Sequence, residues 1–279
     1  MEDLLKVEGL HVSYLARDHR SRVAVAGVSF SVAQGEVLGL MGESGCGKST
    51  LALATMGLLE NTRAKISGSI IFRGANLLNA SERALDTIRG AHISMVHQEP
   101  GIALCPVMRV GQQVAEVVRA HKTWSWEKCR EAAHAVLSRV GLEPTNRIFS
   151  AYPHQLSGGQ LQRVALAQAI VCDPELIIAD EPTASLDARS RSEFIDLLRD
   201  LQQRSRMSML LISHTPEIQA SLANRLMVMR DGRIVEQGAF EELYSTPSDA
   251  YTRSLLHRRS GLEEPAVEER VLAHPQAGR

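Results

Sequence analysis

The sequence predicts an α/β protein with a mostly parallel sheet that is flanked by helices. An apolar run at 37–41 leads into a glycine-rich segment at 42–50 and then into a helical pattern, which is the order of a strand, a tight loop and a helix. From 176 onward, short apolar runs again alternate with helical patterns, as they do in βα units. In such a sheet, ligands bind at the carboxyl ends of the strands.

The first part of the chain is predicted to be rich in strands. Its β-type runs are interrupted by Gly35, Gly42 and Gly68. A helix is expected at about Lys48–Leu58. The expected strands are Leu4–Tyr14, Val23–Val32, Val37–Met41, Ile66–Phe72 and Ile93–His97.

Helical periodicity dominates the middle of the chain. Apolar residues at helix spacing predict helices at Val107–His121, Ser125–Val140 and Gly159–Val171. Ser125 is a suitable N-cap for the second of them, and Gly141 is a suitable stop. This stretch is therefore predicted to be a helical insertion in the α/β fold.

The alternation of strands and helices resumes after this insertion. Helices are expected at Asp187–Arg204 and Pro216–Leu222. Strands are expected at Leu176–Ala179, Met209–Ser213, Arg225–Arg230 and Arg233–Glu236. Beyond 256 the sequence turns to charged residues, Pro and small residues, which predicts a flexible C-terminal tail at 257–279.

The composition is that of a globular protein. Of the 279 residues, 44% are hydrophobic, and 31 Lys and Arg nearly balance 32 Asp and Glu, giving a net charge of −1. This balance, with only 4% aromatic residues, argues against nucleic acid as a partner. The chain begins without a long apolar segment, so we expect neither secretion nor a membrane span. The cysteines lack metal-type spacing and fit a reducing compartment.

The segment 42–50 fits the pattern G-x-x-x-x-G-K-[ST] of a phosphate-binding loop. Backbone N–H groups of such a loop approach the phosphates closely, which requires glycine at several positions. Lys48 would contact the β- and γ-phosphates, and Ser49 would bind Mg²⁺. The alternative is an ordinary glycine-rich turn. The expected nucleotide-binding residues are Gly42, Glu43, Ser44, Gly45, Cys46, Gly47, Lys48, Ser49 and Thr50.

Two adjacent carboxylates, Asp180 and Glu181, follow the apolar run 176–179. Because neighbouring strand residues point to opposite sides, Asp180 can face a metal ion while Glu181 faces the attacking water. Glu181 would then act as the general base. The alternative is that both acids cap the turn at Pro182.

A second glycine-rich segment precedes the helix predicted at Gly159–Val171. The Ser157 hydroxyl and the free N–H groups of a helix N-terminus can bind an anion there. Taken alone, the segment could equally be a plain helix cap. Its place shortly before Asp180 and Glu181 favours phosphate binding. The segment consists of Ser157, Gly158, Gly159 and Gln160.

The ordered set of these motifs resembles the ATP-binding subunits of ABC transporters, over about Leu4 to Leu256. The loop 42–50 matches Walker A, Leu156–Gln160 the signature and Leu176–Glu181 Walker B. Further matches are Tyr14 as the aromatic residue that stacks on adenine, Gln98 as the Q-loop, Ser185–Asp187 as the D-loop and His214 as the switch histidine.

This resemblance implies a fold, a domain division and a mechanism. The fold would be the RecA-like fold of P-loop NTPases, with an antiparallel β subdomain. An ATPase domain would span 1–256, with a helical subdomain at about 99–171 inserted in it. Two such domains would sandwich two ATP molecules, so that the signature of one completes the loop site of the other.

The resemblance assigns roles to single residues as well. Glu181, His214 and Gln98 would be the catalytic residues. Mg²⁺ would be held by Ser49, Gln98 and Asp180. The nucleotide would also contact Tyr14, Ser157, Gly158, Gly159, Gln160 and Asp187.

Some of these residues have plainer interpretations. Gln98 could be a surface amide, Tyr14 a half-buried strand residue and His214 a core or helix-capping histidine. Thr215 departs from the Asp that often follows the switch histidine. Cys46 is most simply a small filler, although a thiol near a helix N-terminus can become reactive.

Three segments, 98–111, 152–160 and 246–256, resemble the dipeptide, oligopeptide and nickel importer branch of the family. Within them, Cys105 replaces a common Asn. The last segment could also be no more than a short amphipathic helix packed on the domain. No cysteine follows Cys172, so we expect no C-terminal iron–sulfur cluster.

The branch implies import of peptides, nickel or a related solute through separate integral membrane permeases. A second, identical or homologous ABC ATPase and an extracytoplasmic solute-binding protein would complete the system, and this chain would lie at the cytoplasmic face of the bacterial inner membrane. The alternative is a soluble ABC-type ATPase of an enzyme complex, as in phosphonate metabolism.

Overall fold

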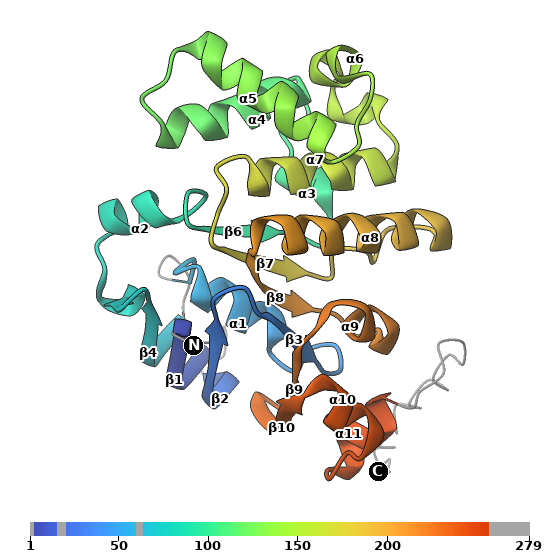
Figure 1. The fold of residues 1–279 in the computed structure, drawn as a ribbon. Helices are drawn as coiled ribbons and strands as arrows, with labels where there is room; N and C mark the ends of the chain where they lie inside the picture. Colours follow the sequence, from blue (N-terminus) through green and yellow to red (C-terminus); the bar gives the residue numbers. More distant parts are fainter. Residues whose placement is uncertain (1–2, 16–20, 60–63, 257–279) are drawn as a thin grey trace, which may run out of the picture.

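A central sheet with helices on one face and a second, smaller sheet near the other forms the body of the molecule (Figure 1). The computed structural model describes residues 3–15, 21–59 and 64–256. The tail predicted at 257–279 lies outside the described residues. No helix within the described ranges has both the length and the apolar character needed to cross a membrane.

The central sheet has six strands among the described residues, in the order β10-β9-β3-β8-β7-β6. All neighbours are parallel except β10, which runs antiparallel to β9. The strands are β3 (Val37–Met41), β6 (Ile93–Val96), β7 (Leu176–Asp180), β8 (Ser208–Ile212), β9 (Arg225–Arg230) and β10 (Arg233–Ala239). The predicted, mostly parallel sheet is thus confirmed.

The inner strands of this sheet are buried on both faces, as a parallel sheet covered on both sides requires. Alternate residues of β8 enter different cores. Met209 and Leu211 pack in the core that contains the helical insertion, whereas Leu210 and Ile212 pack in the core that contains the smaller sheet.

The smaller sheet is antiparallel, with the order β2-β1-β4-β5, and it confirms the predicted antiparallel β subdomain. Buried Leu10 and Val12 alternate with exposed His11 along β1, which gives the sheet one apolar face. Helix α1 shares a core with this face and with the central sheet through Leu51 and Ala52. The elements are β1 (Asp3–Leu15), β2 (Ser21–Ala33), β4 (Ala64–Phe72), β5 (Ala75–Asn76) and α1 (Lys48–Thr55).

The helical insertion lies beyond the β6 edge of the central sheet (Figure 1), and it shares a core with the sheet face that carries Met209 and Leu211. Ser125 caps helix α5 by accepting a hydrogen bond from Lys128 N–H at 3.3 Å, as the sequence predicts. Gly141 follows that helix with φ of +75°, so the predicted stop is also confirmed. The helices are α3 (Pro100–Ala103), α4 (Val110–His121), α5 (Trp126–Arg139), α6 (Thr145–Ser150) and α7 (Gly158–Ile170).

The last part of the chain adds helices beside the central sheet. Leu255 and Leu256 of the final helix are buried together with Met41, the last residue of β3. The segment at 251–256 therefore forms a short helix packed on the domain. The helices are α8 (Ala188–Ser205), α9 (Pro216–Leu222), α10 (Phe240–Ser245) and α11 (Ala250–Leu256).

Several short elements and some boundaries differ from the prediction. The first helix ends at Thr55 rather than Leu58, because the chain turns at Gly57 with φ of +65°. Helix α4 starts at Val110 rather than Val107. The helices α3, α6 and α10 were not predicted, since four to six residues are too few to show a helical period. The structure also contains α2 (Glu82–Ile88) and the 3₁₀ turns Leu77–Asn79 and Pro153–Gln155.

Candidate functional site

The phosphate loop and the predicted residues Gln98, Asp180, Glu181 and His214 lie at the carboxyl ends of four neighbouring parallel strands. β3 leads into the loop 42–50, and β7 ends at Asp180. β8 is followed closely by His214, and β6 by Gln98. All four strands belong to one parallel sheet, so these residues meet at one edge of it (Figure 1).

Glycine is required at two positions of the loop 42–50. A Cβ atom on Gly47, whose φ is +112°, would lie 2.2 Å from the carbonyl oxygen of Ala24. A Cβ atom on Gly42 would lie 2.2 Å from the carbonyl oxygen of Met229. Both contacts are with backbone, which cannot move aside as a flexible side chain does. The loop is therefore held tightly between β2 and β9. It leads directly into the N-terminus of α1.

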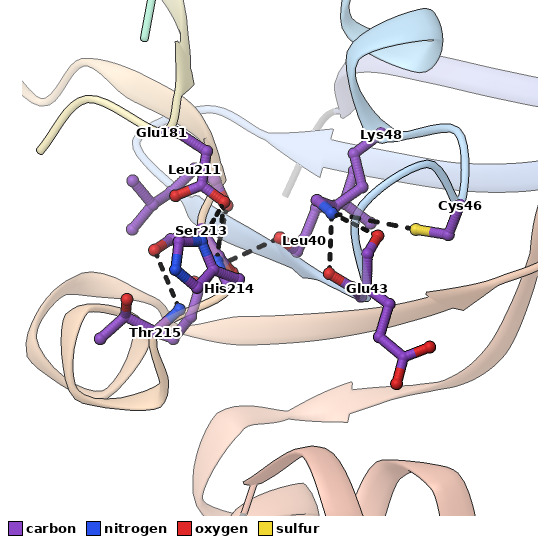
Figure 2. A network of polar contacts seen from close by, with 11 residues as sticks. Leu40, Glu43, Cys46, Lys48, Glu181, Leu211, Ser213, His214 and Thr215 are labelled. Atoms are coloured by element: carbon purple, nitrogen blue, oxygen red, sulfur yellow. Dashed lines mark hydrogen bonds and ion pairs between the residues drawn. The ribbon is translucent and has the colours of Figure 1, made fainter. Parts of the chain in front are cut away.

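The Lys48 side chain lies inside this loop and is 9% exposed. Its ammonium donates hydrogen bonds to the carbonyl oxygens of Gly42 at 2.7 Å and Glu43 at 2.9 Å. Figure 2 shows the ammonium directed toward these carbonyls and the Cys46 sulfur. The loop thus holds a positive charge in the hollow that its own backbone forms, where phosphate oxygens would be strong acceptors.

Cys46 packs in the core between the two sheets and is 8% exposed. Burial raises the pKa of its thiol, while the nearby Lys48 charge acts in the opposite direction. A raised pKa leaves less thiolate, which is the reactive form. Cys46 therefore packs as a small filler, and its raised pKa argues against a reactive thiol.

Asp180, at the end of β7, and Ser49, in the first turn of α1, bring two oxygen ligands together. Asp180 is 8% exposed, and burial raises the pKa of its carboxyl group. A hydrogen bond from the Ser49 hydroxyl opposes this shift, because it stabilises the charged carboxylate. A hydroxyl and a carboxylate are oxygen ligands of the kind that Mg²⁺ prefers, and a cation would favour the charged form of Asp180. These residues fit a magnesium ion.

Glu181 and His214 form a pair across the ends of β7 and β8. One carboxylate oxygen of Glu181 lies 2.7 Å from His214 Nδ1 and accepts the His214 backbone N–H at 2.9 Å. Glu181 has φ of +47°, so the chain turns sharply at this residue as β7 ends. In the alternative, Glu181 caps the turn at Pro182, but the hydrogen bonds of its carboxylate are with His214.

This pairing affects the charge of the histidine. The hydrogen bond to Glu181 raises the pKa of His214, although burial acts in the opposite direction. The His214 side chain is 64% exposed, whereas that of Glu181 is 12% exposed. The His214 ring is therefore accessible to solvent, whereas the Glu181 carboxylate to which it is bonded is nearly buried. Figure 2 shows the pair on one side of the view and Lys48 on the other.

These residues surround a cleft of about 1420 Å³. The Tyr14 hydroxyl approaches Thr50 Oγ1 at 3.4 Å, which brings the predicted adenine-stacking residue to the same cleft. Thr215 also lines it, and its backbone N–H donates to Ser213 Oγ at 3.2 Å. The predicted site residues in the lining are Tyr14, Gly42, Glu43, Ser44, Gly45, Cys46, Gly47, Lys48, Ser49, Thr50, Gln98, Asp180, Glu181 and His214.

Other residues of the cleft were not predicted. Arg22, Val23 and Ala24 of β2 line it, as does Leu255 of α11. Val23 is 58% exposed, which is unusual for an apolar strand residue, but the strand pattern alone gives no sign of a cleft beside it. Leu255 comes from the last helix, so only the packing of the whole chain brings it here.

The segment 157–160 lies outside this cleft, at a separate hollow of about 150 Å³ beside α8. Ser157 Oγ accepts the backbone N–H of Gln160 at 3.3 Å, and Gln160 Oε1 accepts the backbone N–H of Ser157 at 3.0 Å. This reciprocal arrangement is a capping box at the start of α7. The two glycine-rich segments of one chain therefore do not share a cleft.

Asp187 also lies outside the lining of the cleft. Its carboxylate caps α8 by accepting the backbone N–H groups of Arg189 and Ser190, each at 3.0 Å, and the Ser190 hydroxyl at 2.7 Å. The bonds from Ser190 are the main cause that lowers the pKa of Asp187. The carboxylate is thus bound to its own helix.

Comparison with known proteins agrees with this geometry. A family model described as "ABC transporter" matches residues 25–184. The chain belongs to the ABC transporter family. It is therefore an ABC ATPase coupled to transport, and its two sheets and helical insertion are the parts of the ABC cassette fold.

Curated members of the ABC transporter family resemble the chain over most of its length. It is 38% identical over 257 residues to the dipeptide transport ATP-binding protein DppD of Bacillus subtilis, covering 92% of this chain and 76% of that protein. It is 41% identical over 255 residues to the probable peptide ABC transporter ATP-binding protein y4tR of Sinorhizobium fredii, covering 91% and 76%.

Solved ABC structures share the fold. The ATP-binding cassette MJ0796, in a dimeric post-hydrolysis state bound to ADP and Pi, has a TM-score of 0.75 and 26% identity, covering 85% of this chain and 98% of that one. CbiO1 of Clostridium perfringens, described as part of the ABC transporter complex cbiONQ, has a TM-score of 0.74 and 30% identity, covering 88% and 92%.

Proposed function

We propose that this ABC ATPase binds Mg²⁺-ATP in the cleft and hydrolyses it to drive uptake of peptides through separate membrane permeases. The observation that supports ATP hydrolysis most strongly is the meeting of the phosphate loop with Asp180, Glu181 and His214 at one sheet edge. Peptide as the solute is supported by relatives whose names refer to dipeptide and peptide transport. Transport of nickel or a related solute stays an alternative within this branch of the family.

In this function the loop 42–50 holds the triphosphate. Its backbone N–H groups and the N-terminus of α1 supply partial positive charge, and Lys48 adds a full charge inside the loop. The Lys48 ammonium exchanges its hydrogen bonds with Gly42 and Glu43 for bonds to phosphate oxygens. Tyr14, which also lines the cleft, stacks on the adenine.

Ser49, Asp180 and Gln98 would hold Mg²⁺. The ion neutralises charge on the phosphates when bound. The Ser49 hydroxyl is already hydrogen-bonded to Asp180, so two of these three ligands are adjacent without any rearrangement. Gln98 lies where β6 enters the helical insertion, so its position depends on how that insertion is oriented.

Glu181 accepts the proton of the attacking water, and His214 positions the γ-phosphate and that water. The two side chains are joined at 2.7 Å, so a movement of either one alters the position of the other. The nearly buried Glu181 carboxylate is shielded from bulk water, which favours its use as a general base.

The active form is a dimer in which the signature of one ABC ATPase completes the cleft of the other. Ser157, Gly158, Gly159 and Gln160 lie apart from the cleft of their own chain, which supports a role toward a partner. The dimeric, post-hydrolysis state of MJ0796 supports the same arrangement. Partners are a second identical or homologous ATPase, integral membrane permeases and, indirectly, a solute-binding protein, at the cytoplasmic face of the inner membrane.

Exchange of Glu181 for Gln tests this proposal. Glu181→Gln keeps the shape of the side chain but removes the base, so steady-state phosphate release should fall by about 100-fold or more. ATP binding, measured by isothermal titration, should persist, and ATP should trap a dimer visible by light scattering.

Two variants serve as controls for this experiment. Glu175→Gln changes a carboxylate at the opposite end of β7, where it pairs with Arg73 and His92, and should keep turnover near that of the wild type. Lys48→Ala should lose ATP binding itself. Turnover of Glu181→Gln equal to that of the wild type would show that Glu181 is not the base.

A further inference from the structure

The C-terminal helix α11 touches the phosphate loop directly. The backbone N–H of Glu43 donates a hydrogen bond to the Tyr251 hydroxyl at 3.0 Å. These residues are 208 positions apart in the sequence. A hydroxyl from the end of the ATPase domain thus holds the second residue of the loop that begins at Gly42.

The same loop residue is bonded on its other side to Lys48. The Glu43 carbonyl accepts a hydrogen bond from the Lys48 ammonium at 2.9 Å. Glu43 therefore links Tyr251 to Lys48 through two backbone hydrogen bonds. The Glu43 carbonyl that binds the Lys48 ammonium is therefore positioned by the same residue whose N–H is bonded to Tyr251.

Tyr251 is itself held in place by its surroundings. The Arg230 guanidinium lies over its ring, 4.9 Å from the centroid. Burial raises the pKa of the phenol, so its hydroxyl keeps its proton at neutral pH. A neutral hydroxyl fixed by the stacked cation is a well-oriented acceptor for a backbone N–H.

The helix that carries Tyr251 is anchored at both ends. At its start, Asp249 accepts the backbone N–H of Tyr251 at 2.8 Å, and Glu236 of β10 accepts the backbone N–H of Ser248 at 2.8 Å. At its end, Leu255 and Leu256 are buried against Met41, the strand residue that directly precedes the loop. The helix thus supports the strand and the loop together, and Leu255 also lines the cleft.

We infer that Tyr251 is a positioning residue of the nucleotide site, which acts through Glu43 on the loop and on Lys48. This inference rests on the proposed ATP binding in the cleft. Without the hydroxyl, the Glu43 N–H loses its acceptor, the first turn of the loop becomes mobile, and ordering it again on nucleotide binding weakens affinity.

Nucleotide affinity gives the first test, with trinitrophenyl-ATP fluorescence on the full chain. Tyr251→Phe keeps the ring and removes only the hydroxyl, and should bind the probe about three- to tenfold more weakly than the wild type, as loss of one hydrogen bond implies. Ser254→Ala removes a hydroxyl of the same helix, which donates to the Tyr251 carbonyl at 2.9 Å and does not line the cleft, and should leave affinity unchanged. A weakening of less than about twofold in Tyr251→Phe overturns the inference.

Hydrogen exchange of the nucleotide-free protein gives a second test that does not depend on ATP binding. In Tyr251→Phe, peptides covering 42–47 should exchange faster than in the wild type, whereas peptides covering α5 should be unchanged. Unchanged exchange of the loop, or faster exchange throughout the molecule, contradicts a specific positioning role.

The two tests separate failure of this inference from failure of the proposed function. If the wild type does not bind trinitrophenyl-ATP, or if Lys48→Ala binds it equally well, the proposed nucleotide site is wrong, and the exchange experiment alone decides the role of Tyr251. If the wild type binds and Lys48→Ala does not, both tests apply to Tyr251 directly.

Discussion

Glu181 shows how one backbone angle places a proposed catalytic group. Its φ of +47° turns the chain at the end of β7, and its carboxylate reaches His214, 33 positions further along the sequence, at 2.7 Å. A left-handed conformation is unfavourable for a residue with a side chain. The two hydrogen bonds that Glu181 accepts from His214 stabilise this arrangement.

The titration of His214 is a prediction at this scale. Because the hydrogen bond to Glu181 raises the pKa of His214, this pKa should lie above the ordinary histidine value in the wild type and fall toward it in Glu181→Gln. The measurement is an NMR titration of the histidine ring protons. His134, whose pKa is lowered by burial, should titrate alike in both proteins. Equal His214 values would contradict the pairing.

The sign of the effect on stability follows from the same shift. A pKa raised by folding means that the pair stabilises the folded protein fully below the ordinary histidine pKa and loses this contribution as the pH rises through the raised value. The free energies of unfolding of the wild type and of Glu181→Gln, measured with urea, should therefore converge as the pH rises across that interval.

At the scale of elements, the strands were the most predictable parts of the molecule. β3 and β9 lie where the apolar runs predict, because strands buried on both faces are apolar throughout. The start of α4 was missed by three residues. Gln113 of α4 bonds to the backbone of Cys105 and Met108, which keeps the preceding segment in a turn. Such a side-chain restraint does not appear in the apolar periodicity of the sequence.

The cap of α5 gives a prediction at this scale. Ser125→Ala removes the acceptor for the Lys128 N–H, so the free energy of unfolding should fall by about 1 kcal/mol, as measured by urea denaturation. Ser125→Asp keeps an acceptor at the cap and adds a negative charge at the helix N-terminus, and should keep the stability of the wild type. No loss in Ser125→Ala, or an equal loss in both variants, would show that the hydrogen-bond acceptor at residue 125 does not stabilise the helix.

At the scale of the whole molecule, the two segments that are proposed to bind phosphate occupy separate surfaces. The cleft contains the loop 42–50, and the hollow beside α8 contains Ser157 and Gln160. In the proposed function, one chain alone would therefore offer each nucleotide only part of its contacts. This separation explains why turnover in the proposed function requires a second ATPase domain.

Ser157→Arg tests this division. In a Glu181→Gln background, ATP should no longer produce the dimer seen by light scattering, because a bulky charged side chain stands on the surface that meets the partner. Nucleotide binding by the monomer should persist, because Ser157 lies outside the cleft. Ser81→Arg is the matched control, since Ser81 caps α2 in the same way. Undiminished dimerisation of Ser157→Arg would contradict the signature assignment.

The sequence by itself determined the chemistry and most elements of this protein. The spacing of Gly42, Gly47, Lys48 and Ser49 identifies a phosphate loop, and apolar periodicity locates the strands, because both are properties of neighbouring residues. Only the tertiary structure decided which distant groups meet: Glu181 with His214, and Glu43 with Tyr251. Those contacts depend on the strand order β9-β3-β8-β7 and on the docking of α11, and no local pattern encodes either of them.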